Sequence, residues 1–306
     1  MLRKLCVLSS LFLAFALSAL AQDSRRFAFH YAFTVKNLPA ASRVRVWIPA
    51  AQSDAYQEVR VVSAKADLPL KKKREGKYGN QVYFAEVSTS QQAKLHFEIN
   101  YDVLRREHIG LRNAAHAVPA SLSAEERQKD LQPDVLVPTS GLPADLAAKS
   151  RKESRSSSRK HAPFTTTFSL PCATTKRAPV GAAVMSSMPA TPRFEIGFPL
   201  PADKQSSEIA SYHCWSDFYV DGKGWIPVDI SEAWKHQEKR DYFFGSDDVN
   251  RVQFSTGRDL RLNPPQDGKP LNYFVYPYVE VDGQEYPDVS LAFSFADRVT
   301  AVAGKK

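Results

Sequence analysis

The 306-residue chain has few cysteines and lacks the common short motifs for metal or phosphate binding. Its three cysteines, Cys6, Cys172 and Cys214, cannot build a disulfide framework. Stability must therefore come from packed cores, for which a hydrophobic content of 43% is ordinary. No CxxC, HExxH or glycine-rich phosphate loop occurs, so we expect neither a metal nor a cofactor.

Long apolar runs are also absent, except at the N-terminus. Basic residues 3–4 precede the apolar run Leu5 to Leu17, and small residues follow at 19–21. This order is typical of a secretory signal peptide, with cleavage expected between Ala21 and Gln22. No cysteine stands directly after the cleavage point to take a lipid, and no later segment approaches the roughly 20 apolar residues of a membrane span. We expect a secreted or periplasmic protein without a membrane anchor.

The formal charge of +8 does not by itself indicate a nucleic-acid partner. Much of the excess lies in the leader, in the basic run 71–74 and in the segment 149–160. Nucleic-acid surfaces interleave basic and aromatic side chains in one stripe, and no such pattern occurs. We therefore expect no nucleic-acid partner, and we interpret run 71–74 as a solvated strand end or loop.

The segment after the leader is rich in short alternating runs. Five runs without an intervening helix predict an antiparallel β-sandwich, assigned to residues 22–105. His30 and His96 alternate with apolar residues and are expected as strand-face residues, since no further ligand recurs at metal spacing. The predicted strands are 27–35, 43–49, 58–64, 81–88 and 94–103.

A connector is predicted at residues 106–149. Its clearest element is a short helix around 124–128, because Ser123 is a good N-cap residue ahead of it. The prolines between 133 and 143 fit a domain boundary.

The segment 150–192 departs from ordinary globular sequence. It begins SRKESRSSSRKH and continues as a Thr/Pro/Ala stretch with neither helical nor strand periodicity. One interpretation is a flexible linker, because this composition buries too little apolar surface to fold. The other, which we favour, is translation out of frame. Shifting the codons by one base allows an amphipathic helix and then a Gly-rich, Trp-containing loop, and the pattern RFEIGFPLP resumes at Arg193. On either interpretation we expect the segment to be disordered.

Two short alternating runs, Tyr212 to Val220 and Trp225 to Ile230, flank a glycine-containing turn and predict a β-hairpin. His213 and Asp229 stand at nearly equal distances from that turn. Cross-strand neighbours on one face lie roughly 5 Å apart at Cβ. A carboxylate there can orient an imidazole and stabilise its charged form.

These residues resemble the bacterial transglutaminase-like proteins, whose papain-like core uses Cys, His and Asp in that order. The similarity runs from about Phe194 to Glu285, and more loosely before residue 140. It implies that His213 is the general base and Asp229 its orienting partner. The matching motifs are HCW at 213–215, GKGW at 222–225 with Pro227 and Asp229, DYFFG at 241–245, NR at 250–251 and FSTGRD at 254–259.

The resemblance does not supply a nucleophile. Cys6 is removed with the leader, and Cys214 should face away from His213 because strand neighbours point to opposite faces. Cys172 precedes the histidine, but no helix start or adjacent base activates its thiol. On the frame-shift interpretation, the helix headed by the reactive cysteine is lost between about Ala190 and Arg193.

Several neighbouring residues receive no catalytic role. Trp215, Trp225 and Trp234 are explained about equally well by core packing, and Asp217 and Glu232 are taken as ordinary exposed positions. The last block, 271–295, is expected to give two strands around Asp282-Gly283 that complete the core sheet.

The sequence as a whole predicts an α+β protein. An N-terminal antiparallel β-sandwich is followed by a transglutaminase-like (papain-like) α+β core at 193–297, incomplete for want of its cysteine. The family chemistry is thiol acyl transfer or amide hydrolysis on a protein or peptide amide. A base and an orienting carboxylate without a nucleophile cannot form an acyl-enzyme, so we expect this chain to be inactive. The alternative is a non-catalytic, β-rich, two-domain binding or scaffold protein.

Overall fold

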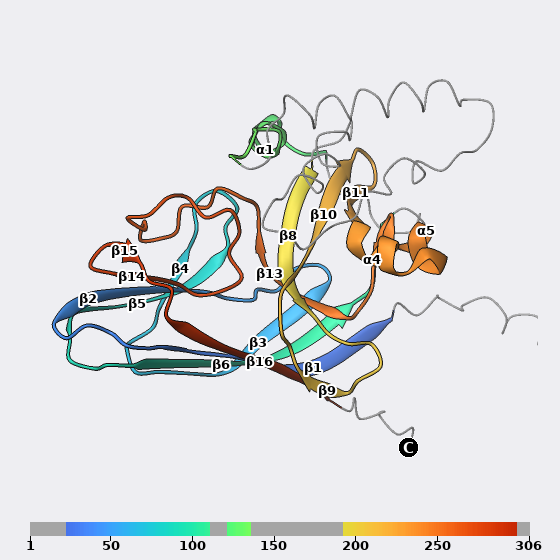
Figure 1. Ribbon diagram of the computed structural model, residues 1–306. Coiled ribbons are helices and arrows are strands. Elements are labelled where there is room, and N and C mark those ends of the chain that lie inside the picture. The colour runs from blue at the N-terminus through green and yellow to red at the C-terminus, as the bar shows by residue number, and fades with distance from the viewer. Residues whose placement is uncertain (1–22, 111–120, 136–191, 299–306) are drawn as a thin grey trace, which may run out of the picture.

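The computed structural model describes residues 23–110, 121–135 and 192–298, and these residues form mostly antiparallel sheets (Figure 1). One five-stranded sheet has the order β3-β6-β1-β16-β9, and a second has the order β15-β14-β2-β5-β4. The first contains β1 (Ser24–Val35), β3 (Gln57–Ala66), β6 (Leu95–Arg106), β9 (Ser206–Glu208) and β16 (Val289–Asp297). The second contains β2 (Ser42–Pro49), β4 (Lys71–Arg74), β5 (Gln81–Ser90), β14 (Tyr278–Val281) and β15 (Gln284–Glu285).

A four-stranded sheet of order β11-β10-β8-β13 lies beside the first sheet (Figure 1). Its strands are β8 (Pro192–Pro199), β10 (His213–Val220), β11 (Gly224–Val228) and β13 (Arg251–Thr256). A two-stranded pair joins β7 (His108–Ile109) and β12 (Ser246–Asp247). In the described ranges, the helical elements are α1 (Ala124–Asp130), α4 (Ile230–Lys235), η2 (Gln237–Lys239) and α5 (Arg240–Phe243).

The predicted α+β fold class is wrong for the part of the chain that the structure describes. Its longest helix is α1, with 7 residues, and the helices after residue 192 have 6, 3 and 4 residues. Helices of one or two turns are too short to form a layer across a sheet. The fold class was taken from the resemblance, whereas these segments themselves have the period-two alternation of strands.

The five strands predicted before residue 105 are present as β1, β2, β3, β5 and β6. The helix predicted after Ser123 is also confirmed. The Ser123 hydroxyl accepts from the Glu126 amide, and the Glu126 side chain accepts from the Ser123 amide. Run 71–74, expected as a strand end or loop, is the exposed edge strand β4, where basic side chains disfavour pairing with another chain.

The strands of block 271–295 were expected from sequence to complete the sheet that carries His213, and this expectation is wrong. Instead β14 pairs with β2, and β16 pairs with β1 along its whole length. The turn at Asp282-Gly283 was placed correctly, and both residues have positive φ, 50° and 80°. A strand's own residues do not specify which distant strand it will pair with, so this long-range pairing could not be read from the local pattern.

The apolar face of the four-stranded sheet packs on the first five-stranded sheet. Phe198, fully buried on β8, has its ring centroid 5.3 Å from that of Phe29 on β1 and 4.6 Å from that of Phe293 on β16. Phe254 on β13 lies 5.5 Å from Tyr31 in the same aromatic cluster. Alternate residues of β8 and β10 point away from this cluster. They form the opposite face of the sheet, which is polar.

Gly197 is required where β8 meets β13. A Cβ atom built on Gly197 would lie 1.8 Å from the carbonyl oxygen of Val252, a backbone atom that cannot move without shifting the strand. We expect Gly197→Ala to lower the free energy of unfolding by about 2 to 3 kcal/mol. Gly76→Ala is the control, because a Cβ there meets nothing within 4 Å. Equal urea midpoints for the two variants would contradict this close approach.

Candidate functional site

His213 and Asp229 form a direct hydrogen-bonded pair, as the hairpin predicted. The distance from His213 Nε2 to Asp229 Oδ2 is 2.6 Å, and the Asp229 side chain is fully buried. The register pairs Ser216 with Val228, so continuing the hairpin would place Asp229 opposite Trp215. The pair is therefore diagonal rather than directly opposed, a separation that long side chains still bridge. Their proximity is confirmed, whereas their catalytic roles stay a prediction.

Asp229 is held at the junction of β11 and α4. Its amide donates to the carbonyl of Phe243, and the amide of Gly245 donates to the carbonyl of Pro227, so the DYFFG motif fixes the end of the hairpin. Asp229 is also the N-cap of α4, and its Oδ1 accepts from the Glu232 amide and the Ser231 hydroxyl, each at 3.0 Å. These bonds fix the carboxylate's orientation.

The Asp229 carboxyl is ionised at neutral pH. Burial alone would raise the pKa of Asp229, but the neighbouring His213 and Arg251 outweigh burial and hold this pKa below its usual range. An ionised carboxylate only accepts hydrogen bonds, so His213 Nε2 carries the proton shared by the pair. In the neutral imidazole, Nδ1 is then the basic nitrogen.

Arg251 contacts the Asp229 carboxylate of the His213–Asp229 pair. It was assigned no role from sequence. Its guanidinium, 2% exposed, places Nη1 2.9 Å from Asp229 Oδ2 and 3.0 Å from Asp247 Oδ1. The guanidinium carbon also lies 4.8 Å from the ring centroid of Trp215, and that ring stacks 6.0 Å from the His213 ring. Although burial alone would lower the pKa of Arg251, the carboxylates of Asp247 and Asp229 raise it. The guanidinium therefore stays charged.

Cys214 faces away from His213, as expected for its neighbour on a strand. The register pairs Cys214 with Ile196, and both pack against the main hydrophobic cluster. Cys6 and Cys172 lie outside the described residues. Within the described ranges, no thiol therefore shares the polar face of the sheet with His213.

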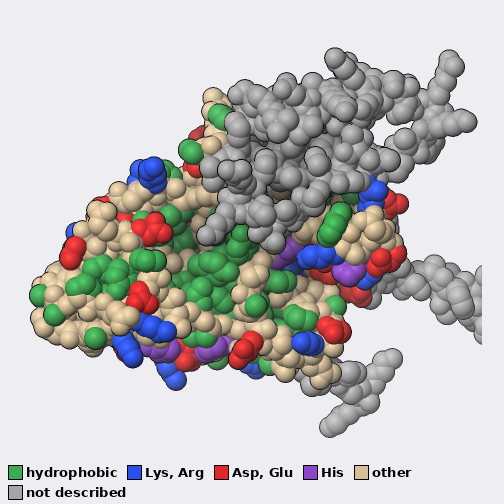
Figure 2. Space-filling model, in the orientation of Figure 1, with side chains coloured by type: hydrophobic (Ala, Val, Ile, Leu, Met, Phe, Trp, Pro, Cys, Tyr) green, Lys and Arg blue, Asp and Glu red, His purple; other side chains and the backbone are tan. Residues whose placement is uncertain are grey.

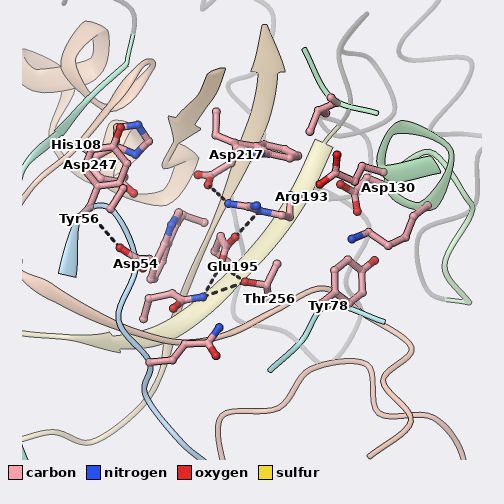
Figure 3. A pocket seen from close by; sticks show the side chains of 18 of the residues that line it. Asp54, Tyr56, Tyr78, His108, Asp130, Arg193, Glu195, Asp217, Asp247 and Thr256 are labelled. Carbon is pink, nitrogen blue, oxygen red and sulfur yellow. Dashed lines mark hydrogen bonds and ion pairs between the residues drawn. The ribbon is translucent and has the colours of Figure 1, made fainter. Parts of the chain in front are cut away.

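A polar cavity of about 310 Å³ opens on the face of the sheet that carries His213. Trp215 and Asp247 line it and also contact Arg251, so they connect the cavity to the pair. Figure 3 shows Arg193 between Glu195 and Asp217. Arg193 Nε lies 2.7 Å from Glu195 Oε1, and Arg193 Nη2 lies 3.1 Å from Asp217 Oδ2. The described ionisable side chains of the wall are Asp54, Glu126, Asp130, Glu195, Asp217, Asp247, Arg105, Lys129, Arg193, Tyr56, Tyr78 and His108.

Burial changes the protonation of three carboxyl groups in this wall, those of Asp247, Glu195 and Asp217. It raises the pKa of Asp247 to about 7, because the neighbouring Arg251 compensates only part of the lost hydration. Burial raises the pKa of Glu195 and of Asp217 as well. Asp217 was expected to be exposed, and that expectation is wrong: it is 7% exposed and paired with Arg193.

We expect the free energy of unfolding to fall as the pH rises from 5 to 8. The folded pKa of Asp247, about 7, lies above its ordinary value of 3.8, so the folded state holds this proton more tightly. The resulting stabilisation is complete below the unfolded pKa and is lost as the pH rises through 7, by about 1.4 kcal/mol per pH unit. Urea denaturation at the two pH values measures the slope. Asp247→Asn, which does not titrate, should reduce the slope, and an unchanged slope would contradict this assignment.

The other tryptophans and histidines considered from sequence have different neighbours. Trp225 stacks under Arg193 at 4.0 Å, whereas Trp234 on α4 is 53% exposed. His30 Nδ1 lies 2.8 Å from Asn100 Oδ1, and His96 contacts Thr34 across the strands. In the described residues, no three His, Cys, Asp or Glu side chains are grouped as metal ligands would be.

Two other observations concern the surface and the membrane. On the face shown in Figure 2, basic side chains lie among acidic ones, and no continuous basic stripe crosses its described part. Among residues 23–110, 121–135 and 192–298, no helix has the length and apolar content needed to cross a membrane.

Comparisons with known proteins leave the family open. No family model matches the chain. A protein of Haemophilus influenzae, itself uncharacterized, is 38% identical over 84 residues. That match covers 23% of this chain, and the chain spans only 23% of the length of that relative. A crystal structure from Cytophaga hutchinsonii, provisionally described as a cysteine protease, aligns with 90% of this chain and 98% of its own at 10% identity, with a TM-score of 0.47. A likeness of that size does not establish a shared fold.

Proposed function

We propose that His213 and Asp229 are the general base and the orienting carboxylate of a thiol acyl-transfer site of the transglutaminase-like kind. The observation that carries the proposal is the 2.6 Å bond from His213 Nε2 to the buried Asp229 carboxylate. That bond leaves His213 Nδ1 as the nitrogen that accepts a proton. A carboxylate that fixes the tautomer and stabilises the imidazolium is the support a thiol-activating histidine requires.

The proposed reaction begins with proton transfer to His213 Nδ1. His213 Nδ1 takes the proton of a cysteine thiol, and the thiolate attacks the carbonyl carbon of an amide. The imidazolium returns the proton to the amide nitrogen as the C–N bond breaks, which leaves a thioester and a released amine. Water or a second amine then attacks the thioester and releases the thiol. The substrate class we propose is a protein or peptide amide outside the cytoplasm, in keeping with the predicted leader.

We propose further that the chain as it stands does not carry out this reaction. Cys214, on the opposite face of β10, packs in the hydrophobic cluster and is not placed to give its proton to His213. The sequence around Cys172 has no helix-start signal and no adjacent base, the features expected to lower the pKa of a thiol. The nucleophile is therefore the missing part.

The test compares two proteins in amide hydrolysis and amine-transfer assays. The purified chain should be inert, and a protein with codons 148–193 restored to the alternative frame, with its cysteine, should be active. Turnover by the present chain that is eliminated by Cys172→Ser would instead make Cys172 the nucleophile and overturn the frame interpretation. Inertness of both proteins would contradict the proposed function and favour the non-catalytic binding protein.

A further inference from the structure

Arg251 reaches His213 by two separate routes. Through Asp229, the guanidinium contacts the same oxygen, Oδ2, that binds His213 Nε2. Through Trp215, it packs on the ring that stacks against the imidazole, with an interplanar angle of 27° between His213 and Trp215. The imidazole is oriented by its hydrogen bond to Asp229 and by its stacking on Trp215. Arg251 contacts both of these residues.

We infer that Arg251 is a positioning residue, which holds the Asp229 carboxylate and the Trp215 ring so that the His213 imidazole keeps one orientation. This inference rests on the proposed function for its catalytic consequence. Its structural part, the fixed imidazole, stands without it.

An arginine suits this position better than a lysine. The guanidinium is planar and presents several N–H groups in fixed directions, so it can bind two carboxylates and stack on an aromatic ring at once. Nη1 contacts Asp229 and Asp247, and Nη2 lies 3.4 Å from Asp248 Oδ1. An ammonium is a point charge on a flexible stem and cannot keep all these contacts.

The two oxygens of Asp229 show why removing Arg251 would affect His213. Oδ1 is held by α4, through the Glu232 amide and the Ser231 hydroxyl. Oδ2 has two partners, His213 and Arg251, so Arg251 sets where this oxygen lies relative to the imidazole.

The experiment uses the full chain and proton NMR of the His213 Nε2–H group. This proton is hydrogen bonded to a buried carboxylate and should give a resolved signal far downfield, assigned by its loss in His213→Gln. We expect Arg251→Lys to broaden or remove this signal while the backbone spectrum stays folded.

Arg45→Lys is the matched control. Arg45 is also buried, lies 3.1 Å from Glu280 and 3.2 Å from Asp267, and stacks on Trp47 at 4.5 Å, but it is remote from His213. Its replacement should leave the Nε2–H signal in place. An unchanged signal in Arg251→Lys, or equal loss in both variants, would overturn the inference.

A second variant covers the case in which Arg251→Lys does not fold. Arg251→Ala leaves a space lined by carboxylates, and added guanidinium chloride in the millimolar range should restore both folding and the Nε2–H signal. Folding restored without the signal would also overturn the inference.

The catalytic consequence is measured in the frame-restored protein. There Arg251→Lys should lower kcat at least about tenfold and leave KM nearly unchanged, because misorientation affects the chemical step. If the frame-restored protein is inactive, the proposed function fails, and the NMR result still decides the role of Arg251. If it is active and Arg251→Lys keeps full kcat, the positioning role fails and the proposed function stands.

Discussion

Replacing His213 with alanine in the frame-restored protein should lower kcat roughly 10³-fold, within the range that a positioned general base contributes. The alanine removes the nitrogen that accepts the thiol proton and also leaves Asp229 without the partner 2.6 Å from its Oδ2. Arg251 still neutralises the carboxylate, so the fold should survive. Steady-state hydrolysis of a peptide amide measures the effect.

His236→Ala is the control for this loss. His236 follows α4, and its side chain is 48% exposed, so it is a nearby histidine without a buried carboxylate partner. It should retain full activity. A similar loss in both variants would mean that the assay reports on folding rather than on a general base.

Replacing Phe198 with alanine should lower the free energy of unfolding by about 4 kcal/mol. Phe198 is fully buried and joins the sheet that carries His213 to the first five-stranded sheet, through ring contacts with Phe29, Tyr31 and Phe293. The loss combines the transfer of the ring and the cavity left between the two sheets. Urea denaturation followed by tryptophan fluorescence measures it.

Leu291→Ala is the control, on the first five-stranded sheet. Leu291 lies on β16 and is 40% exposed, so its replacement should change the free energy of unfolding by no more than about 0.5 kcal/mol. Comparable losses in the two variants would contradict the packing of β8 on β1 and β16.

Local patterns in the sequence predicted much of this structure. Alternation identified five of the strands, the capping residue Ser123 identified α1, and the glycine turn brought His213 and Asp229 together. Each of these features depends on residues close in sequence. Such features can be read without knowing the tertiary contacts.

Features that depend on distant residues were missed. The pairing of β16 with β1 joins strands more than 250 residues apart, and the polar face of the four-stranded sheet is buried only by tertiary contacts. Asp217 was therefore taken as exposed. Arg251 was noticed within a motif, but its role depends on Trp215 and Asp229 meeting around it. The one local signal was a pair of acidic residues, 247–248, three to four residues before the arginine that begins β13.

The fold class failed for a different reason. It was carried over from a resemblance in the segment 194–285, and the described residues there form strands with helices of six residues or fewer. The predicted leader, 1–21, and most of the anomalous segment, 150–192, lie outside the described residues. The leader, the domain limits and the two interpretations of that segment stay predictions.

The most direct test of the His213–Asp229 pair as a thiol-activating site is the rate of cysteine alkylation by iodoacetamide in the frame-restored protein at pH 6. An imidazolium held beside Asp229 stabilises a neighbouring thiolate, whereas an unperturbed thiol with a pKa near 8.5 is almost wholly protonated at that pH. The account predicts that the protein with His213 reacts at least about tenfold faster than its His213→Ala variant. Equal rates in the two proteins would contradict it.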